Sequence, residues 1–445
     1  MKDLTTGKPE RLILNFALPI AAGNIFQLCY SFADVWIVGK KLGSEALAAV
    51  GSTSTLNDLI VGFLIGLTNG FAVITAQSFG AKKYDLLRRA VSHTIMLGLL
   101  VSAVLTVFSV SFLTPILNLL NVPAEHFENA CAYARVILLG MTFSMIYNIC
   151  ASVLRAIGDT VTPLIFLIIS AVLNVILDFV FIGGMGTGVE GAAYATIIAQ
   201  AISAILCAIY VHIRYPLLHL KKQDLMPNGS MVHKLMSCGI SMGLMNSLVA
   251  FGTVALQSSI NTFGTNIIVA HTAARKLTSL FMMPFAVLGM TMSAYCAQNY
   301  GAGKYGRIRC GVFKAVSFCW IWCAGLIVVI YTIVPVMLRV ITSAEDPEII
   351  DTATLYLRIN CILYCVTAVI SVFRNSLQGI GVHHTPIISS AIELAGKVAV
   401  VMFLAPRIGY MGIILSEPIV WVVMVIPLIV KLLSHPAMKV KTVEP

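Results

Sequence analysis

Two aspartates lie inside long apolar stretches of this 445-residue chain. Asp34 stands in QLCYSFADVWIVG, and Asp178 stands in SAVLNVILDFVF one helical turn after Asn174. A carboxylate near the centre of a bilayer costs about 3 kcal/mol, so one that persists there usually faces a cavity or a partner. Carboxyl groups held in this way can capture and release a small cation. The alternative is that both aspartates lie at the solvated outer ends of their helices.

Residues near both aspartates supply further oxygen atoms. One face of the first apolar helix carries four polar residues at the spacing 3, 4, 3: Asn24, Gln27, Ser31 and Asp34. If Asp34 and Asp178 share a pocket, desolvation and mutual repulsion favour a proton held by the pair. With oxygens from Asn174, Thr196 or Ser31, the same cluster suits a hard cation such as Na⁺. The residue types do not decide between H⁺ and Na⁺.

The second half of the chain does not repeat this cluster. At an offset of 223 residues, Lys397 replaces Asn174 and Val401 replaces Asp178, while Glu393 lies one turn before Lys397. A contact between side chains four residues apart on a helix neutralises both charges. We therefore interpret Glu393 and Lys397 as a structural ion pair.

A few other residues are candidates for a substrate cavity. Met282 and Met283 offer a soft lining that adapts to varied apolar cations, although methionines more often only pack. Arg275 is a further cavity candidate because it is charged within an apolar stretch. The sequence assigns no partner or role to three other charged residues, which are Asp58, Arg374 and Glu417.

The composition identifies the elements that must position these residues. Hydrophobic residues make up 58% of the chain, charged residues 11%, and the mean hydropathy is +0.92, which is typical of a multi-pass membrane protein. The sequence contains no P-loop, HExxH or GxSxG motif and no paired His/Cys metal spacing, so we expect no enzyme and no cofactor beyond a coupling ion. The eleven cysteines are scattered among apolar segments and predict no disulfide framework.

Apolar runs follow one another along the chain with short polar breaks. With about 20 residues for each crossing, they predict an all-α integral membrane fold of twelve helices. The expected spans are 12–38, 46–77, 87–118, 127–157, 162–184, 189–213, 233–262, 266–298, 307–340, 349–380, 384–405 and 409–434.

An internal repeat relates the two halves. AQSFGAKKYDLLRRAV (76–91) and AQNYGAGKYGRIRCGV (297–312) agree at eight of sixteen positions, where unrelated segments would agree at about one. LRAIGDTVTP (154–163) likewise aligns with LQGIGVHHTP (377–386). Since six is an even number, both six-helix bundles enter the membrane in the same direction and are related by a pseudo-twofold axis. The expected parts are an N-lobe (1–213), a cytoplasmic linker (214–232), a C-lobe (233–434) and a cytoplasmic tail (435–445).

Basic residues predict the orientation in the membrane. Lys and Arg accumulate before the first span and after the second, sixth and eighth, whereas the loops near 119–127, 184–189 and 262–266 contain none. Because Lys and Arg collect on the cytoplasmic side, both termini are expected in the cytoplasm. Lys40 and Lys41 are the exception. The net charge of +10 therefore follows from topology and predicts no nucleic-acid partner.

Four segments in this order resemble the multidrug and toxic compound extrusion (MATE) transporters over essentially the whole chain. They are ADVWIVGKKLGSEALAAVG after the first span, AQSFGAKKYDLLRRA after the second, LRAIGDTVTP before the fifth, and AQNYGAGKYGRIR after the eighth. The resemblance implies a secondary active antiporter of the plasma (inner) membrane that exports drugs or organic cations in exchange for H⁺ or Na⁺. It also implies ion coupling at the positions of Asp34, Asn174 and Asp178. Some family members use acids in the seventh and tenth helices, but 233–262 and 356–380 contain no Asp or Glu here.

Alternatives to this function stay open at the level of sequence. Relatives of the fold flip lipid-linked oligosaccharide precursors, and a cavity containing Arg275, Arg374 and Lys397 would suit such anions. An ion channel or a receptor is a further alternative. Neither would need two repeats of six helices with buried acids in only one of them, so the repeat argues against both. We expect a monomer whose partners are the lipid bilayer and small amphipathic or cationic substrates.

Overall fold

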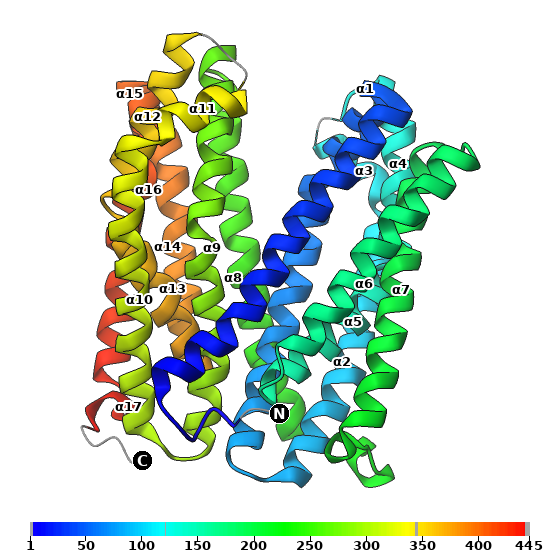
Figure 1. The fold of residues 1–445 in the computed structure, drawn as a ribbon, viewed down its shortest axis with the longest axis vertical. Helices are drawn as coiled ribbons and strands as arrows, with labels where there is room; N and C mark the ends of the chain where they lie inside the picture. Colours follow the sequence, from blue (N-terminus) through cyan, green and yellow to red (C-terminus); the bar gives the residue numbers. More distant parts are fainter. Residues whose placement is uncertain (1–2, 121, 343–345, 441–445) are drawn as a thin grey trace. The chain divides into compact units, whose positions relative to one another are not determined.

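The computed structural model describes residues 3–120, 122–342 and 346–440. The first two residues of the predicted N-lobe and the last five of the predicted tail lie outside this part. Within it the chain is helical and contains no strand (Figure 1). Nine helices are long and apolar enough to cross a membrane, and two bent helix pairs raise the number to eleven. The prediction of an all-α integral membrane protein is confirmed.

The helices of the first half begin with α1, which runs from Pro9 to Gly80. They continue with α2 (Tyr84–Ser111), α3 (Leu113–Leu119), α4 (Ala124–Leu139), α5 (Met141–Ala156), α6 (Val161–Asp178), a π-helical turn (Phe179–Gly184) and α7 (Gly188–Arg214). Two 3₁₀ turns, Pro216–Leu218 and Lys222–Leu225, lead into the second half.

The second half begins with α8, which runs from Gly229 to Ile260. It continues with α9 (Thr265–Gly301), α10 (Tyr305–Thr332), α11 (Val334–Thr342), α12 (Pro347–Cys361), α13 (Tyr364–Gly379), α14 (His384–Ala399), a π-helical turn (Val400–Leu404), α15 (Ala405–Ile408), α16 (Tyr410–Ser434) and α17 (Pro436–Lys439).

The first two predicted spans are two helical segments that meet at a kink inside α1. The helical geometry is interrupted at Gly43, between the predicted spans 12–38 and 46–77. Its φ of 86° and ψ of −177° are open to glycine alone. A second glycine in this region of φ, Gly264 (φ 93°), precedes α9 in the second half. With α1 divided at Gly43, the helices of the described residues match the twelve expected crossings.

Four predicted spans are broken rather than continuous. The span 87–118 is interrupted at Phe112 and 307–340 at Ile333, in each case just before a proline (Pro115 and Pro335) that removes a helical hydrogen-bond donor. The span 127–157 bends by 44° at Gly140, where a Cβ atom would lie 2.3 Å from Ile197. The span 349–380 bends by 56° between α12 and α13. Hydropathy detects apolar length, so it does not report these bends.

The chain divides into two compact units. Unit 1 consists mainly of Leu18–Gly243, and unit 2 consists of Leu4–Ala17 with the residues from Leu244 onward. In unit 1, α7 packs against α4, α5 and α6; in unit 2, α9 packs against α10, α12 and α13. Both changes of unit fall inside helices, next to Pro19 in α1 and after Gly243 in α8. The lobe boundaries expected from the sequence stay a prediction.

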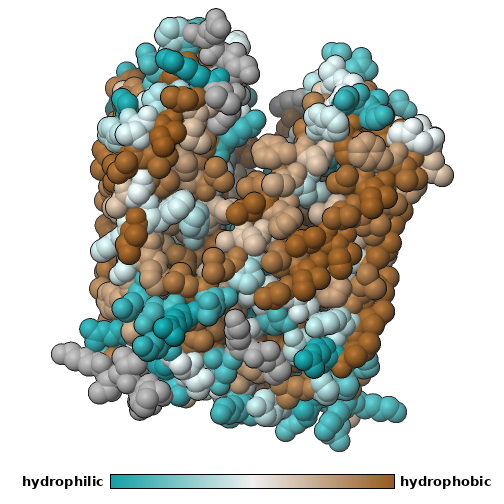
Figure 2. Space-filling model, viewed as in Figure 1, coloured by the Kyte–Doolittle hydropathy of each residue, from teal (hydrophilic) through white to brown (hydrophobic). Residues whose placement is uncertain are grey.

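The visible side surface of each unit is apolar along the middle of its helices, with hydrophilic residues at their ends (Figure 2). Val107, Ile213 and Ile321 are among the large apolar side chains that are exposed to the surroundings of the described residues. Exposed apolar area of this extent is stable only against lipid. The surface therefore agrees with a protein that crosses the membrane many times.

In unit 2, the repeated motif holds the segment that precedes α1. The side chains of Gln298 and Asn299 are fully buried, and they bond to the backbone of Leu4 at 3.0 and 3.1 Å. Arg307 donates to the carbonyl oxygen of Gly7 at 2.8 Å and to Asn299 Oδ1 at 3.1 Å. These contacts hold the segment from Leu4 to Gly7, just before α1, within unit 2.

In unit 1, the other copy of the motif holds the segment that precedes α8. Asp224 is buried and lies 3.3 Å from Arg88 Nε and 3.9 Å from Arg89 Nε. The backbone N–H of Asn228 donates to His93 Nε2 at 3.1 Å. The motif copy at 297–312 therefore holds the segment before α1, the first helix of the first half. The copy at 76–91 holds the segment before α8, the first helix of the second half. We call these two sets of contacts the anchors.

A third contact fixes the beginning of the linker. The Tyr215 hydroxyl donates to the Asp159 carboxylate, which also accepts from Thr162 Oγ1 at 2.6 Å. Burial alone raises the pKa of Asp159, but hydrogen bonds from Thr162 and Tyr215 outweigh it, and the pKa lies below its usual value. The carboxylate is therefore ionised at neutral pH and keeps both hydrogen bonds.

Two glycine pairs allow α1 and α8 to meet backbone to backbone within unit 1. Gly66 and Gly70 (GLTNG) face Gly239 and Gly243 (GISMG). A Cβ atom on Gly66 would lie 2.5 Å from the carbonyl oxygen of Met242. Small residues four apart are the usual means of close helix packing in a membrane. Sequence reasoning based on charge and hydropathy did not single out these motifs.

Alanine at Gly66 and at Gly62 should have opposite effects on stability. Gly66→Ala places a methyl group against the α8 backbone and should cost about 1–3 kcal/mol. Gly62, one turn earlier, has no atom within 4 Å of its Cβ position, so Gly62→Ala should be neutral or stabilise by up to about 1 kcal/mol. Thermal unfolding in detergent measures both. Equal melting temperatures for the two variants would contradict the packing described.

The anchor in unit 1, in which Asp224 pairs with Arg88, can be tested by comparing two carboxylates that contact this arginine. Asp224 and Asp85 both pair with Arg88, but the Asp85 side chain is 86% exposed and that of Asp224 is 5% exposed. Asp224→Asn should release the linker and speed tryptic cleavage at Arg214, Lys221 and Lys222 about tenfold, as expected for loss of a charged hydrogen bond. Asp85→Asn should leave cleavage unchanged, because exposed pairs contribute little. Similar rates for both variants would argue against the anchor.

Candidate functional site

Unit 1 brings the two predicted aspartates together. Asp34 comes from α1 and Asp178 from the last residue of α6, and their carboxyl groups lie close enough to interact. Asp178 has no exposed surface, so it does not lie at a solvated helix end. The Oδ1 atoms of both carboxyl groups are buried without a hydrogen-bond partner among the described residues. This pair is the candidate ion site.

Asn174 supports the pair from one turn earlier on α6. With its amide oriented to satisfy both neighbours, Asn174 donates to Asp178 Oδ2 at 3.1 Å and accepts from Thr196 Oγ1 at 3.2 Å. Thr196 comes from α7, which packs along α6. Directly after Asp178 the helix widens into the π-helical turn Phe179–Gly184, a distortion that is frequent at functional sites. The three residues expected at the ion site from resemblance therefore lie in one cluster.

Two tyrosines complete the surroundings and were not predicted. The hydroxyls of Tyr30 and Tyr133 lie within electrostatic reach of both carboxyl groups, and Tyr30 also forms a hydrogen bond with Thr196. Tyr30 stands four residues before Asp34, so helical spacing could have identified it. Tyr133 is on α4 and carries no sequence signal that links it to the site.

The four polar residues predicted on one face of the first helix differ in exposure. Asn24 and Asp34 are half-buried, whereas Gln27 and Ser31 are exposed, and the Ser31 hydroxyl donates to the carbonyl oxygen of Gln27 at 3.0 Å. Asp58, further along α1, is also exposed. The predicted face is therefore partly buried at Asn24 and at Asp34 and open between them.

In unit 2, Glu393 pairs with two cations. Lys397 Nζ lies 2.9 Å from Glu393 Oε1, and Arg374 Nη2 lies 3.5 Å from Glu393 Oε2. The three side chains are 10% exposed or less, so the ion pairs are internal. Arg374 also donates to Ser389 Oγ at 3.2 Å, and its Nε–H is buried without an acceptor. The partner of Arg374, which the sequence did not assign, is Glu393.

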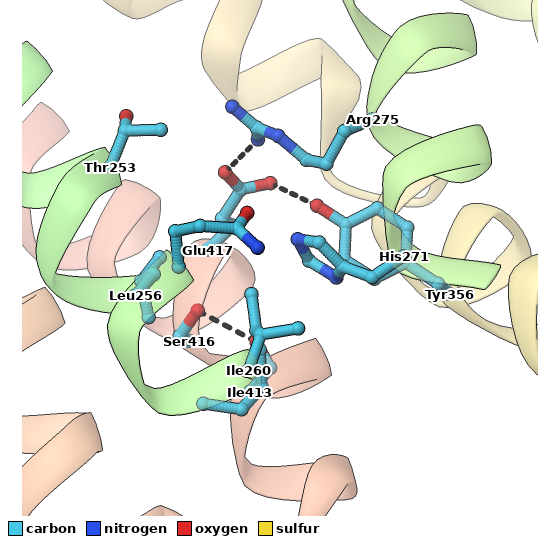
Figure 3. Close-up of a pocket in the computed structure, with 10 residues that line it drawn as sticks. Thr253, Leu256, Ile260, His271, Arg275, Tyr356, Ile413, Ser416 and Glu417 are labelled. Atoms are coloured by element: carbon cyan, nitrogen blue, oxygen red, sulfur yellow. Dashed lines mark hydrogen bonds and ion pairs between the residues drawn. The ribbon is translucent and has the colours of Figure 1, made fainter. Parts of the chain in front are cut away.

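Unit 2 also contains a pocket whose charged residues the sequence did not connect. Glu417 of α16 accepts one hydrogen bond from Arg275 of α9 and one from the Tyr356 hydroxyl of α12 at 2.8 Å (Figure 3). His271 packs against the Tyr356 ring, with 5.1 Å between ring centres, and its Nδ1 lies 3.0 Å from the Tyr410 hydroxyl. The remaining lining residues are Thr253, Leu256, Gln257, Ile260, Ile413 and Ser416. Met282 and Met283 are half-buried on α9 outside this lining.

Comparison with known proteins identifies the class of protein. The MatE family model matches residues 19–180 and again 241–404, one match in each half. Probable multidrug resistance protein YoeA of Bacillus subtilis (strain 168) is 30% identical over 323 residues, which cover 71% of this chain and 70% of that protein. The Shewanella oneidensis protein named FAD transporter is 23% identical over 430 residues, which are 94% of each chain.

Solved structures agree with the fold. A MOP superfamily transporter from Pyrococcus furiosus superposes with a TM-score of 0.87 at 21% identity, covering 96% of this chain and 97% of the other. An outward-facing multidrug resistance MATE family transporter of the MOP superfamily gives 0.86 at 22% identity over 97% and 98%. The described protein is thus a multi-pass membrane transporter and not an enzyme. The chain belongs to the MatE family of multidrug efflux transporters.

Removal of Glu393 should cost more stability than removal of either cation. Glu393→Gln leaves Arg374 and Lys397 buried without a carboxylate, which should destabilise the protein by about 3–5 kcal/mol. Lys397→Met should cost less, because Glu393 keeps its contact with Arg374. Thermal unfolding of the purified variants in detergent measures the difference. A smaller loss for Glu393→Gln than for Lys397→Met would contradict the arrangement.

Proposed function

We propose that this protein is a secondary active antiporter that exports small amphipathic or cationic compounds by alternating access. The close approach of Asp34 to the buried carboxyl group of Asp178 supports this proposal most directly. Two carboxyl groups that share one proton form a site that changes charge when the proton leaves. A change of charge inside an apolar bundle is what couples an ion gradient to a conformational change.

We propose H⁺ as the coupling ion rather than Na⁺. Two carboxyl groups this close repel each other when both are ionised, and one shared proton removes that repulsion. Na⁺ would require several oxygens to surround it. Asn174 uses its amide for Asp178 Oδ2 and for Thr196. Sodium coupling is the alternative outcome of the test below.

The transport cycle follows from the electrostatics of the pair. In the outward-facing state a proton joins Asp34 and Asp178 and removes their repulsion. In the inward-facing state loss of this proton leaves two carboxylates that repel each other and attract a cationic substrate. Exchange of substrate for proton then depends on the different affinities of the two states for each ligand.

We propose that the protein acts in the plasma membrane as a monomer. Both of its termini would lie in the cytoplasm. The basic loops described above support this orientation. The names of relatives from Bacillus subtilis and Thermotoga maritima support drug-like substrates, since each is a probable multidrug resistance protein. The same comparisons favour export of small molecules over flipping of lipid-linked oligosaccharides.

Neutralising either aspartate should abolish coupled export. Asp34→Asn and Asp178→Asn remove the titratable pair, and dye efflux driven by an imposed pH gradient should fall about a hundredfold, as for loss of a positioned proton-transfer group. Asp58→Asn changes an exposed carboxylate on the same helix as Asp34 and should retain efflux. Membrane insertion, measured by size-exclusion chromatography, should be unchanged in all three. Efflux at the original rate by both pair variants would exclude the proposed site.

The coupling ion is identified in proteoliposomes with separate H⁺ and Na⁺ gradients. Dye movement should follow the pH gradient at equal Na⁺ on both sides. Movement that follows only the Na⁺ gradient would contradict proton coupling while leaving antiport itself intact.

A further inference from the structure

Unit 1 contains polar side chains on α5 that lie outside the candidate ion site. Ser144, Asn148 and Ser152 follow one another at a spacing of four residues, which places them on one side of this helix. Ser152 is fully buried, and the other two are half-buried. Polar residues inside membrane helices are costly, and a series of them often marks an ion pathway. We call these three residues, together with Gln200 of α7, the polar row.

The polar row begins next to the candidate ion site. Thr196, which contacts Asn174, lies one turn before Gln200 on α7. The Ser144 hydroxyl donates to Gln200 Oε1 and so connects α7 with α5. One turn further along α5, Asn148 Nδ2 donates to the carbonyl oxygen of Ser144 at 2.9 Å. Polar groups therefore lead from the carboxyl pair to the interface of α5 and α7.

The packing of α5 on α7 gives the polar row its direction. A Cβ atom on Gly140 would lie 2.3 Å from Ile197, so the two helices approach closely at this level. Ser144 meets Gln200 further along both helices, which shows that they run parallel. The row therefore leads away from the ion site toward the end of α5, and the topology proposed above places this end in the cytoplasm.

A fixed positive charge lies at the end of the polar row. Arg155, about one turn after Ser152, donates to Asn69 Oδ1 at 3.3 Å. A positive charge lowers the affinity of nearby groups for a proton. The carboxylate of Asp159 follows just beyond the end of α5. A proton that reaches this end is therefore released rather than held.

We propose that the polar row is the route by which the proton leaves the carboxyl pair of unit 1 for the cytoplasm. Ser144 and Gln200 are positioning residues at the point where this route passes from α7 to α5. Hydroxyl and amide groups keep their own protons at neutral pH, so they act by holding the water molecules that pass the proton on. This inference rests on the proposed proton coupling.

The test compares two modes of transport by the full-length protein in proteoliposomes. Dye efflux driven by a pH gradient requires a proton to leave the carboxyl pair in every cycle. Dye counterflow, in which labelled dye exchanges for unlabelled dye at equal pH on both sides, requires no proton release. A residue that serves only the proton route should therefore affect the first rate and not the second.

Gln200→Met keeps the length of the side chain and removes its amide. It should slow pH-driven efflux about tenfold, as expected for loss of one hydrogen bond on the route, and leave counterflow unchanged. Ser144→Ala should have the same effect, and Ser144→Thr, which keeps a hydroxyl, should recover most of the driven efflux. Thr106→Val is the control, because it removes a hydrogen bond from α2 to the carbonyl oxygen of Leu138 outside the polar row and should change neither rate.

Two results would overturn the inference. The first is pH-driven efflux at the wild-type rate in both Gln200→Met and Ser144→Ala. The second is an equal loss of driven efflux and counterflow in these variants, which would make the polar row structural. Melting temperatures identify a variant that fails to fold, and the comparison of Ser144→Ala with Ser144→Thr then decides. Wild-type efflux that ignores the pH gradient would instead contradict proton coupling itself.

Discussion

Each charged group within the apolar helices must find its partner inside the same bundle, because lipid offers neither water nor counterions. This constraint accounts for the three arrangements that define the interior of the protein. Asp34 and Asp178 lie beside each other, Glu393 lies between two cations, and Glu417 lies between Arg275 and Tyr356. The helices that supply these residues are held at the distances that such pairing requires. Packing and electrostatics therefore depend on each other in this fold.

The internal repeat preserves the backbone while its chemistry has diverged. Both halves end a corresponding helix in a π-helical turn, at Phe179–Gly184 and at Val400–Leu404. At the matched positions before these turns, however, unit 1 has Asn174 and Asp178 where unit 2 has Lys397 and Val401. One unit thus holds a carboxyl pair, and the other holds Glu393 between two cations. The two similar bundles therefore differ in the charges that they carry at a few buried positions.

The repeated sixteen-residue motif (76–91 and 297–312) has a structural role that its composition did not reveal. Its copy in unit 2 binds the backbone before α1, and its copy in unit 1, with His93 two residues further on, binds the linker before α8. Both α1 and α8 pass from one unit to the other. The unit 2 anchor holds the segment before α1, and most of α1 belongs to unit 1. The unit 1 anchor holds the segment before α8, whose second part belongs to unit 2. The glycine motifs of α1 and α8 add close backbone packing within unit 1. The motif copies that resemble the family's sequence therefore also bind the segments that precede α1 and α8.

Sequence alone determined the membrane class, the all-α fold, the repeat and the two aspartates of the proposed ion site. These properties follow from local quantities, namely hydropathy, helical spacing and the cost of a charge in lipid. Only the tertiary structure decided that the first two spans meet at a kink at Gly43, that four other spans are broken, and that Tyr133 and Tyr30 lie near the carboxyl pair. It also decided that Arg275 and Glu417, 142 positions apart, pair with each other. Partners so distant in sequence meet only through helix packing, and neither hydropathy nor periodicity contains that information.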